Sequence, residues 1–372
     1  MTPDVLIVGA GIVGCAVAEA LTSRGARIEI VDPRGVGDGA TQASAGMLVP
    51  HTEGRHDPWL AAVGVRSMTA YDALLERVPP IDDGPPLLAR PGSLEVAMDG
   101  QEAADLQQHA ASLAAVGVES EFLSPAAARG LEPAVTSACT GALYVAGHGY
   151  ARAAALTRGL WDAASRRGAR LTRASVDSID ATARGIQVHA GGRDLTSGAV
   201  VLAAGSWAAG IRIGTLAPLP IRPIRGQLLE LSWPDTPPVH VVGGSRCYSL
   251  AWADGTMLAG ATVEDVGFDD RATVGGVGDL LDALRALVPA SAGATFTRVR
   301  VGFRPMTPDR RPMIGPSARV PGLVYAVGHY RNGVLLAPVT ADLVVKALAG
   351  QDDPAFAACD PGRFGDFDRS TP

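Results

Sequence analysis

The chain has 372 residues, of which 47% are hydrophobic and 19% charged, and its formal net charge at pH 7 is −6. A soluble globular protein of this length exceeds one compact core, so two domains are expected. The acidic balance, without a block of Lys or Arg, argues against nucleic acid or an anionic membrane surface as a partner. The four scattered cysteines form no Cys-x-x-Cys pair and the histidines show no metal-binding spacing, so neither structural disulfides nor a metal site is expected.

A cytoplasmic location is expected, because a strand begins almost at the first residue and leaves no basic segment for a secretory signal. The most apolar helical stretch, 334–348, is interrupted by Pro338, Asp342 and Lys346, so no membrane span is expected. Cysteines without disulfide partners agree with the same compartment.

The first motif is a strand, a glycine turn and a helix at the N-terminus. Residues 5–8 form a short apolar run typical of a strand buried on both faces, and Gly9, Gly11 and Gly14 follow in Gly-x-Gly-x-x-Gly spacing. The first glycine allows a tight turn, the second lets the backbone approach a pyrophosphate, and the third lets helix and strand pack closely. Residues 12–24 then show helical periodicity, and the N–H groups at the helix start face the anion.

A second strand, 27–31, ends at Asp32, whose carboxylate is placed to bind a ribose hydroxyl about 20 residues after the glycines. Together these features predict an adenine dinucleotide. The loop 35–47 consists mostly of Gly, Ala, Ser and Thr, so it can lie close against a ligand. A small-residue loop that runs back towards the pyrophosphate favours FAD over a nicotinamide cofactor, and Asp32 would repel the 2′-phosphate of NADP.

The middle of the chain leaves this unit, returns and leaves again. Residues 51–144 contain amphipathic helices and an alternating strand but no obvious chemistry. A helix and buried strands, the last ending at Gly205, return the chain to the dinucleotide unit, where Val176 would lie beside the adenine. Residues 218–303 then show several strand-like runs and one helix, typical of a substrate-domain sheet.

The last segment repeats the strand–turn–helix pattern, with a strand at 323–327, a turn at 328–333 and a helix at 334–349. Its helix start can point at a second part of the same cofactor. A flavin gains negative charge near N1 and O2 when it is reduced, and a helix N-terminus there would stabilise that charge. Arg331 at this helix start opposes the helix dipole, which indicates an anionic partner, either substrate or cofactor.

The order of these segments predicts an α/β protein with two interleaved domains. A Rossmann-like FAD-binding domain would comprise residues 1–50, 149–216 and 304–360. An α+β substrate domain, built on a largely antiparallel sheet, would comprise residues 51–148 and 217–303. Residues 361–372 would form a C-terminal tail.

The run Gly-His-Tyr-Arg-Asn-Gly-Val-Leu-Leu-Ala-Pro-Val-Thr-Ala at 328–341 resembles the glycine oxidases of the thiazole branch of thiamine synthesis, within the D-amino-acid oxidase group of FAD enzymes. Supporting matches, spread over almost the whole chain, are the glycine turn and the segments 45–47, 225–227, 260–264 and 303–309. Only the C-terminal run is specific to the glycine oxidase branch.

This resemblance implies that FAD is bound non-covalently and that the flavin itself does the chemistry, with no catalytic side chain required. Cofactor contacts would come from both turns, the strand ends and the small-residue loop: Gly9, Gly11, Ile12, Val13, Gly14, Asp32, Pro33, Ala40, Thr41, Ala45, Gly46, Met47, Val176, Gly205, His329, Tyr330, Arg331, Asn332, Gly333, Val334 and Leu335.

The resemblance also implies a substrate site at Arg304, Arg331, Tyr248 and Met47. A guanidinium fork binds a carboxylate in bidentate fashion and orients the α-carbon. Hydride would pass from that carbon to flavin N5, glycine would yield glyoxylate and ammonia, and dioxygen would be reduced to hydrogen peroxide. The alternatives are packing for Tyr248 and Met47, and a surface ion pair for Arg304.

Two departures from the family pattern keep the substrate open. The strand of Tyr248 lacks the Pro and Arg that relatives often carry, and Arg246 and Val263 stand where some relatives have His and Met. A sarcosine or D-amino-acid oxidase or dehydrogenase is therefore the alternative enzyme, and a non-catalytic flavoprotein the alternative of another class. A homo-oligomer, a tetramer as in many relatives, is also expected.

Overall fold

The structure, a computed structural model, describes residues 2–78, 86–183 and 185–364, and part of the expected tail, 365–372, lies outside the described residues. Its centre is a six-stranded sheet in which all neighbours pair in parallel except the edge strand β20. The strand order is β20 (Met313–Pro316), β21 (Leu323–Val327), β13 (Ala199–Leu202), β1 (Val5–Val8), β2 (Ile28–Val31) and β9 (Arg170–Thr172).

Alternate side chains of β1 enter two different cores, as a strand covered on both faces requires. Ile7 packs with the helices on one face. Leu6 and Val8 pack on the other face. The helices of the first face are α1 (Ile12–Thr22), α3 (Pro58–Arg77), α6 (Ala153–Arg166) and α8 (Gly333–Leu348). The second face is covered by a four-stranded sheet and η2: β12 (Arg193–Ser197), β11 (Gly185–Ala190), β10 (Val176–Thr182), β14 (Arg212–Ile213) and η2 (Gly205–Gly210).

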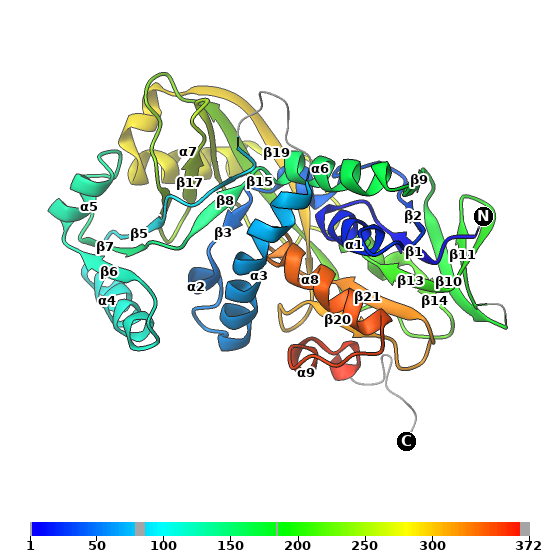
Figure 1. Cartoon of the computed structure of the whole chain (residues 1–372). Coiled ribbons are helices and arrows are strands. Elements are labelled where there is room, and N and C mark those ends of the chain that lie inside the picture. The colour runs from blue at the N-terminus through cyan, green and yellow to red at the C-terminus, as the bar shows by residue number, and fades with distance from the viewer. Residues whose placement is uncertain (1, 79–85, 184, 365–372) are drawn as a thin grey trace.

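The second large unit is an eight-stranded sheet, antiparallel except where β16 pairs with β5. Its order is β19 (Thr295–Met306), β15 (Arg222–Ser232), β18 (Thr256–Gly260), β17 (Tyr248–Ala251), β16 (Val241–Gly243), β5 (Ser93–Ala97), β7 (Gly141–Val145) and β6 (Ser120–Leu123). Its helices are α4 (Gly100–Ala115), α5 (Pro125–Leu131) and α7 (Val274–Leu287). In Figure 1 this unit lies beside the parallel sheet, and β15 and β19 lie at the junction.

Short elements complete the described chain. A three-stranded sheet contains β3 (Met47–Leu48), β8 (Gly149–Ala151) and β4 (Leu88–Ala89). The remaining short helices are α2 (Pro50–Glu53), α9 (Phe356–Cys359), η1 (Ala40–Ala43), η3 (Pro289–Gly293) and η4 (Pro361–Phe364). Among the described residues, no helix is both long and apolar enough to cross a bilayer.

The predicted α/β fold with a largely antiparallel second sheet is confirmed. The sequence of residues 170–179 predicts one continuous strand, and this prediction is wrong, because β9 pairs with β2 while β10 pairs with β11 in the other layer. The chain crosses between layers at 173–175, and an apolar pattern does not report that crossing. Helix α3, expected in the substrate domain, shares its apolar core with α1 and α8, while the domain boundaries themselves stay a prediction.

Candidate active site

A single cavity of about 970 Å³ is lined by residues of the parallel sheet and of the eight-stranded sheet. Both glycine turns, the loop after β2 and the inner ends of β17 and β19 contribute to its wall. A volume at the upper end of the range for small-molecule sites suits an extended ligand such as a dinucleotide. The two strand–turn–helix units, at opposite ends of the sequence, therefore open on one space.

The first turn is closely packed around its glycines. Gly9 has φ +111°, and a Cβ there would lie 2.4 Å from the carbonyl oxygen of Ala203. A Cβ on Gly14 would lie 2.0 Å from the carbonyl oxygen of Gly9, so only glycine allows α1 to start this close to β1. Gly11 lines the cavity, and the Ile12 N–H donates to Thr41 Oγ1 at 3.1 Å. The helix start is thus joined to the small-residue loop.

Asp32, at the end of β2, is buried and lines the cavity. One carboxylate oxygen accepts the Ala10 N–H at 3.0 Å, and the other accepts the N–H groups of Arg34 at 2.8 Å and Gly35 at 3.1 Å. These bonds tie the glycine turn to the following loop. With three of its about four lone pairs occupied, the carboxylate keeps one for a ligand donor, and its contact with a ribose hydroxyl stays a prediction.

The second turn is held by contacts with distant segments. The Tyr330 N–H donates to the carbonyl oxygen of Pro305 at 2.8 Å, and Tyr330 has φ +50°. His329 is buried, its Nε2 lies 2.9 Å from Thr340 Oγ1, and burial lowers the pKa of His329 to about 4. An imidazole with so low a pKa is a weak base, so His329 fits a structural or cofactor-contacting role better than that of a general base.

Helix α8 starts at this turn, and Pro338 inside it cannot donate to the carbonyl of Val334. The buried Tyr71 hydroxyl of α3 donates to that carbonyl instead. The first turn of α8 is therefore held in place by α3. Gly333 and Val334 line the cavity, so the positive end of the helix dipole opens on it.

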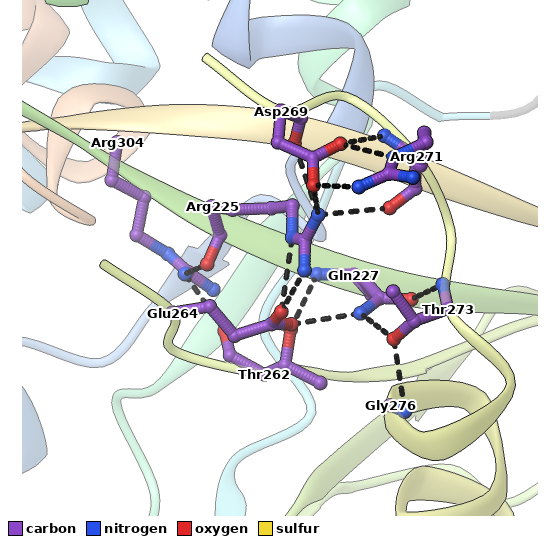
Figure 2. A network of polar contacts seen from close by, with 9 residues as sticks. All are labelled: Arg225, Gln227, Thr262, Glu264, Asp269, Arg271, Thr273, Gly276 and Arg304. Carbon is purple, nitrogen blue, oxygen red and sulfur yellow. Dashed lines mark hydrogen bonds and ion pairs between the residues drawn. The ribbon is translucent and has the colours of Figure 1, made fainter. Parts of the chain in front are cut away.

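Arg304, near the end of β19, lies on the cavity wall. Its Nη1 donates to the carbonyl oxygens of Thr262 at 2.9 Å and Arg225 at 3.3 Å, as Figure 2 shows. Its guanidinium also lies against Gly226, where a Cβ would come within 2.5 Å of it. Among the described residues, no carboxylate forms an ion pair with Arg304. Its charge is therefore free for an anion in the cavity.

Arg331, in contrast to Arg304, has a carboxylate partner. Its Nε donates to Glu53 Oε2 at 2.7 Å, and its side chain is 50% exposed while that of Glu53 is 10% exposed. The anionic partner inferred from the sequence was substrate or cofactor, whereas the partner that the structure provides is this carboxylate. Arg331 still lines the cavity, so it can contact a ligand as one half of an ion pair.

Tyr248 and Met47 also line the cavity. The hydroxyl of Tyr248 lies over Gly260, where a Cβ would be 3.1 Å from it, and burial raises the pKa of this phenol. Tyr248 therefore keeps its proton at neutral pH and can donate a hydrogen bond. Gly46, before Met47, has φ +78°, and a Cβ there would lie 1.9 Å from the Ala151 carbonyl oxygen.

The cavity brings together almost every residue proposed from the sequence. Those on its wall are Gly9, Gly11, Ile12, Val13, Asp32, Pro33, Ala40, Thr41, Ala45, Gly46, Met47, Val176, Gly205, Tyr248, Arg304, His329, Tyr330, Arg331, Asn332, Gly333 and Val334. Gly14 and Leu335 are not on it. Gly14 serves the helix–strand contact, and the Leu335 side chain packs in the core shared with α3.

Sequence reasoning missed the polar residues that residues 51–144 contribute. Glu53, Arg55 and Glu95 all line the cavity, and Arg55 Nη1 lies 3.5 Å from Glu95 Oε1. Burial raises the pKa of Glu95. An acidic residue on the face of β5 opposite Leu94 and Val96 was the available signal, because alternate strand residues face opposite sides.

Comparison with known proteins agrees with this geometry. Residues 4–347 match the family described as FAD dependent oxidoreductase. The chain belongs to that family. Its sequence is 33% identical to the glycine oxidase of Geobacillus kaustophilus over 362 residues, which cover 95% of this chain and 94% of that protein. It is 32% identical to the bifunctional protein ThiO/ThiG of a Nostoc species over 96% of this chain, although it spans only 54% of that protein.

The fold agrees as well. A crystal structure of glycine oxidase from Geobacillus kaustophilus superposes with a TM-score of 0.91 at 30% identity, covering 97% of this chain and 99% of the other. The predicted relationship to glycine oxidases within a FAD oxidoreductase family is thereby confirmed, and this chain is a FAD-dependent oxidoreductase.

Proposed function

We propose that this protein is a glycine oxidase, which converts glycine, dioxygen and water to glyoxylate, ammonia and hydrogen peroxide. Other small primary amino acids would react in the same way, and a small secondary amino acid would release its amine in place of ammonia. The observation that carries the proposal is Arg304, a guanidinium without a carboxylate partner among the described residues, on the wall of a cavity shared by both glycine turns. The similarity to glycine oxidases supports the choice of amino acid.

The residues of the cavity fit FAD. Gly9, Gly11 and the start of α1 would hold the pyrophosphate, because backbone N–H groups and a helix dipole meet there without side chains in the way. Asp32 would hold the ribose and the turn at 328–333 the flavin ring. When bound, FAD supplies the hydride acceptor. The four cysteines are buried and none lies on the cavity wall, which supports non-covalent attachment.

The chain itself binds and orients the amino acid. Arg304 would hold the substrate carboxylate with its planar fork, and the protonated Tyr248 hydroxyl would donate to the same group. Positioning of this kind can supply several kcal/mol of a barrier. Arg331, paired with Glu53, would border the site and contribute less charge to it.

The reaction is proposed to serve the thiazole branch of thiamine synthesis in the cytoplasm, by a protein that forms a homo-oligomer, as the resemblance implies. The likeness to a ThiO/ThiG protein supports this role. Deletion of the gene, with growth compared in the presence and absence of thiamine, tests the role in thiamine synthesis. The solution mass of the purified protein tests whether it forms a homo-oligomer.

The deciding experiment is anaerobic reduction of the purified flavoprotein by glycine, sarcosine, D-alanine and D-proline, followed by admission of air. We expect bleaching of the flavin by glycine and stoichiometric peroxide on reoxidation. Much faster reduction by sarcosine or a D-amino acid would move the assignment to that oxidase. Reduced flavin that persists in air until a dye is added would indicate a dehydrogenase, and a spectrum unchanged by every amino acid would indicate a non-catalytic flavoprotein.

A further inference from the structure

The segment 261–273, between β18 and α7, is fastened to β15 by a cluster of polar side chains (Figure 2). Its start faces the cavity, since Ala261 and Val263 line it. Phe268, further along the segment, stacks on Trp207 with ring centroids 5.4 Å apart. The segment thus borders the cavity on the side of Arg304, and its place depends on what holds it to β15.

Arg225 is the centre of that cluster. Its side chain is 4% exposed, and its Nε and Nη2 both donate to Glu264 Oε2. Its Nη1 lies 3.0 Å from Asp269 Oδ2 and donates to the carbonyl oxygens of Asp269 and Arg271. One buried guanidinium therefore holds three residues of the segment at once.

Gln227, also on β15, continues the cluster. Its Nε2 donates to Glu264 Oε1 at 2.7 Å and to Thr273 Oγ1 at 3.0 Å, while its Oε1 accepts the Thr273 N–H at 2.9 Å. Its own N–H donates to Thr262 Oγ1 at 2.9 Å. Gln227 is fully buried, so both ends of the segment are fixed by bonds away from water.

The cluster ends at Arg304. The carbonyl oxygens that accept from Arg304 Nη1 belong to Thr262, which is bonded to Gln227, and to Arg225, which also accepts the Glu264 N–H at 3.0 Å. Gly226, between the two cluster residues of β15, gives the guanidinium its flat contact. Within the described part of the chain, both hydrogen bonds that the Arg304 guanidinium donates thus go to residues that the cluster holds.

A buried ion pair contributes little to stability over an apolar pair of the same volume, so its presence calls for another reason. We propose that Arg225, Gln227 and Glu264 are positioning residues for substrate binding, which hold the Thr262 and Arg225 carbonyls where they aim the Arg304 guanidinium into the cavity. The inference rests on the proposed role of Arg304 as the group that binds the substrate carboxylate. These three residues need not touch the substrate themselves.

The test is a double-mutant cycle between Arg225→Lys and Arg304→Ala in the FAD-loaded protein. The first readout is the dissociation constant of acetate, a carboxylate without an amine, from its perturbation of the flavin spectrum. The second is the second-order rate constant of anaerobic flavin reduction by glycine. Lysine keeps the charge of Arg225 but loses the fork that joins Glu264, Asp269 and the carbonyls. We expect Arg225→Lys to weaken acetate binding about tenfold, because the carbonyls that orient the Arg304 guanidinium would no longer be held in place. FAD should remain bound.

In the Arg304→Ala background the same substitution should change acetate binding and glycine reduction less than about twofold, because the group it positions is gone. The matched control is Arg222→Ala. Arg222 Nη1 pairs with Asp265 at 2.9 Å and joins the same strand to the same segment, but the pair is exposed and has no contact with Arg304. Its effect should stay below about twofold in both backgrounds.

Equal losses from Arg225→Lys with and without Arg304 would overturn the inference, since the cluster would then act on the fold alone. If Arg225→Lys does not fold, Glu264→Gln, which keeps length but removes the charge bonded to Arg225, takes its place in the cycle. A wild-type protein that binds acetate but is reduced by no amino acid would contradict the proposed function. The positioning inference would still be tested, because the acetate dissociation constants of the variants complete the double-mutant cycle. Acetate binding unchanged by Arg304→Ala would overturn the inference itself.

Discussion

The two strand–turn–helix units that open on the cavity reach the same geometry by different means. The first, β1 to α1, depends on glycines packed against main-chain atoms, since a Cβ on Gly14 would meet the Gly9 carbonyl and a Cβ on Gly9 would meet the Ala203 carbonyl. The second, β21 to α8, carries the bulky sequence His329 to Asn332 and is held by contacts with Pro305, Thr340 and Glu53. The first turn therefore depends on small residues that allow close main-chain contacts, and the second depends on side-chain and backbone contacts with distant segments.

This difference matches the tasks that we propose for the two turns. A pyrophosphate needs backbone N–H groups and space, which glycines supply. An amino acid needs charged and polar side chains at set positions, and those must be oriented by further residues. The end of the cavity where we propose that the substrate binds is accordingly lined by Arg304, Tyr248, Arg331 and Glu53 from β19, β17, the second turn and α2.

The largest expected effect is that of Gly14→Ala in the first turn. A Cβ 2.0 Å from the Gly9 carbonyl oxygen forces α1 away from β1, which should cost about 3 kcal/mol or more of the free energy of unfolding. FAD content should fall with it. Denaturant unfolding and the flavin absorbance of the purified variant measure both quantities.

The control is Gly130→Ala in α5, where the added Cβ would meet no atom within 4 Å apart from its chain neighbours and the backbone of its own helix. This variant should retain wild-type FAD content and stability. A Gly14→Ala protein that unfolds like the wild type would show that the first turn is not closed by main-chain packing, and the contrast between the two units would be lost.

The same contrast explains what the sequence could predict. The order of strand, glycines, helix and Asp32 is contiguous, so the first unit and the cofactor class follow from spacing. The contact of Glu53 with Arg331 joins residues 278 positions apart, and no spacing reports it. Arg304 could be proposed only through the family resemblance, since its neighbours Gly226 and Thr262 come from other strands and loops.

At the substrate end, Arg304→Ala should have the greatest effect on kinetics. The loss of charge-assisted hydrogen bonds to the substrate carboxylate is worth about 3 kcal/mol, or roughly a hundredfold in kcat/KM for glycine. FAD should remain bound. Steady-state peroxide assays and flavin absorbance measure the two effects.

Arg298→Ala, on the same strand β19, is the matched control. Arg298 pairs with Glu230 and is 61% exposed, so its loss should leave kcat/KM unchanged. If Arg304→Ala behaved like Arg298→Ala, Arg304 would be a structural residue and the substrate carboxylate would bind elsewhere.

We expect the free energy of unfolding to depend on pH through His329 in the second turn. Its pKa is lowered to about 4 in the folded protein, below the unfolded value of about 6.5, so its stabilising contribution is complete above pH 6.5 and is lost as pH falls towards 4. Acidification from pH 7 to pH 5 should therefore lower the free energy of unfolding by about 2 kcal/mol through His329.

Unfolding at a series of pH values with FAD in constant excess, in wild type and His329→Gln, isolates this contribution. The buried His148, whose pKa is lowered to about 3, adds a slope of the same sign in both proteins. The free energy of unfolding of the variant should therefore fall less on acidification than that of the wild type, and the difference is the contribution of His329. Identical slopes would mean that His329 is solvated and is not buried beneath the second turn.

The smallest effect is expected for Arg331→Ala, and it sharpens the comparison between the two arginines. Glu53 already neutralises Arg331, and half of the side chain is exposed, so the substrate gains less from it than from Arg304. We expect KM for glycine to rise about tenfold or less, with kcat and FAD content retained.

Glu53→Gln removes the competing carboxylate and should lower KM when Arg331 is present but have no effect in the Arg331→Ala protein. A KM for Arg331→Ala as high as that for Arg304→Ala would reverse the ranking, because it would place the substrate carboxylate at the second turn and require Glu53 to leave Arg331 when substrate binds.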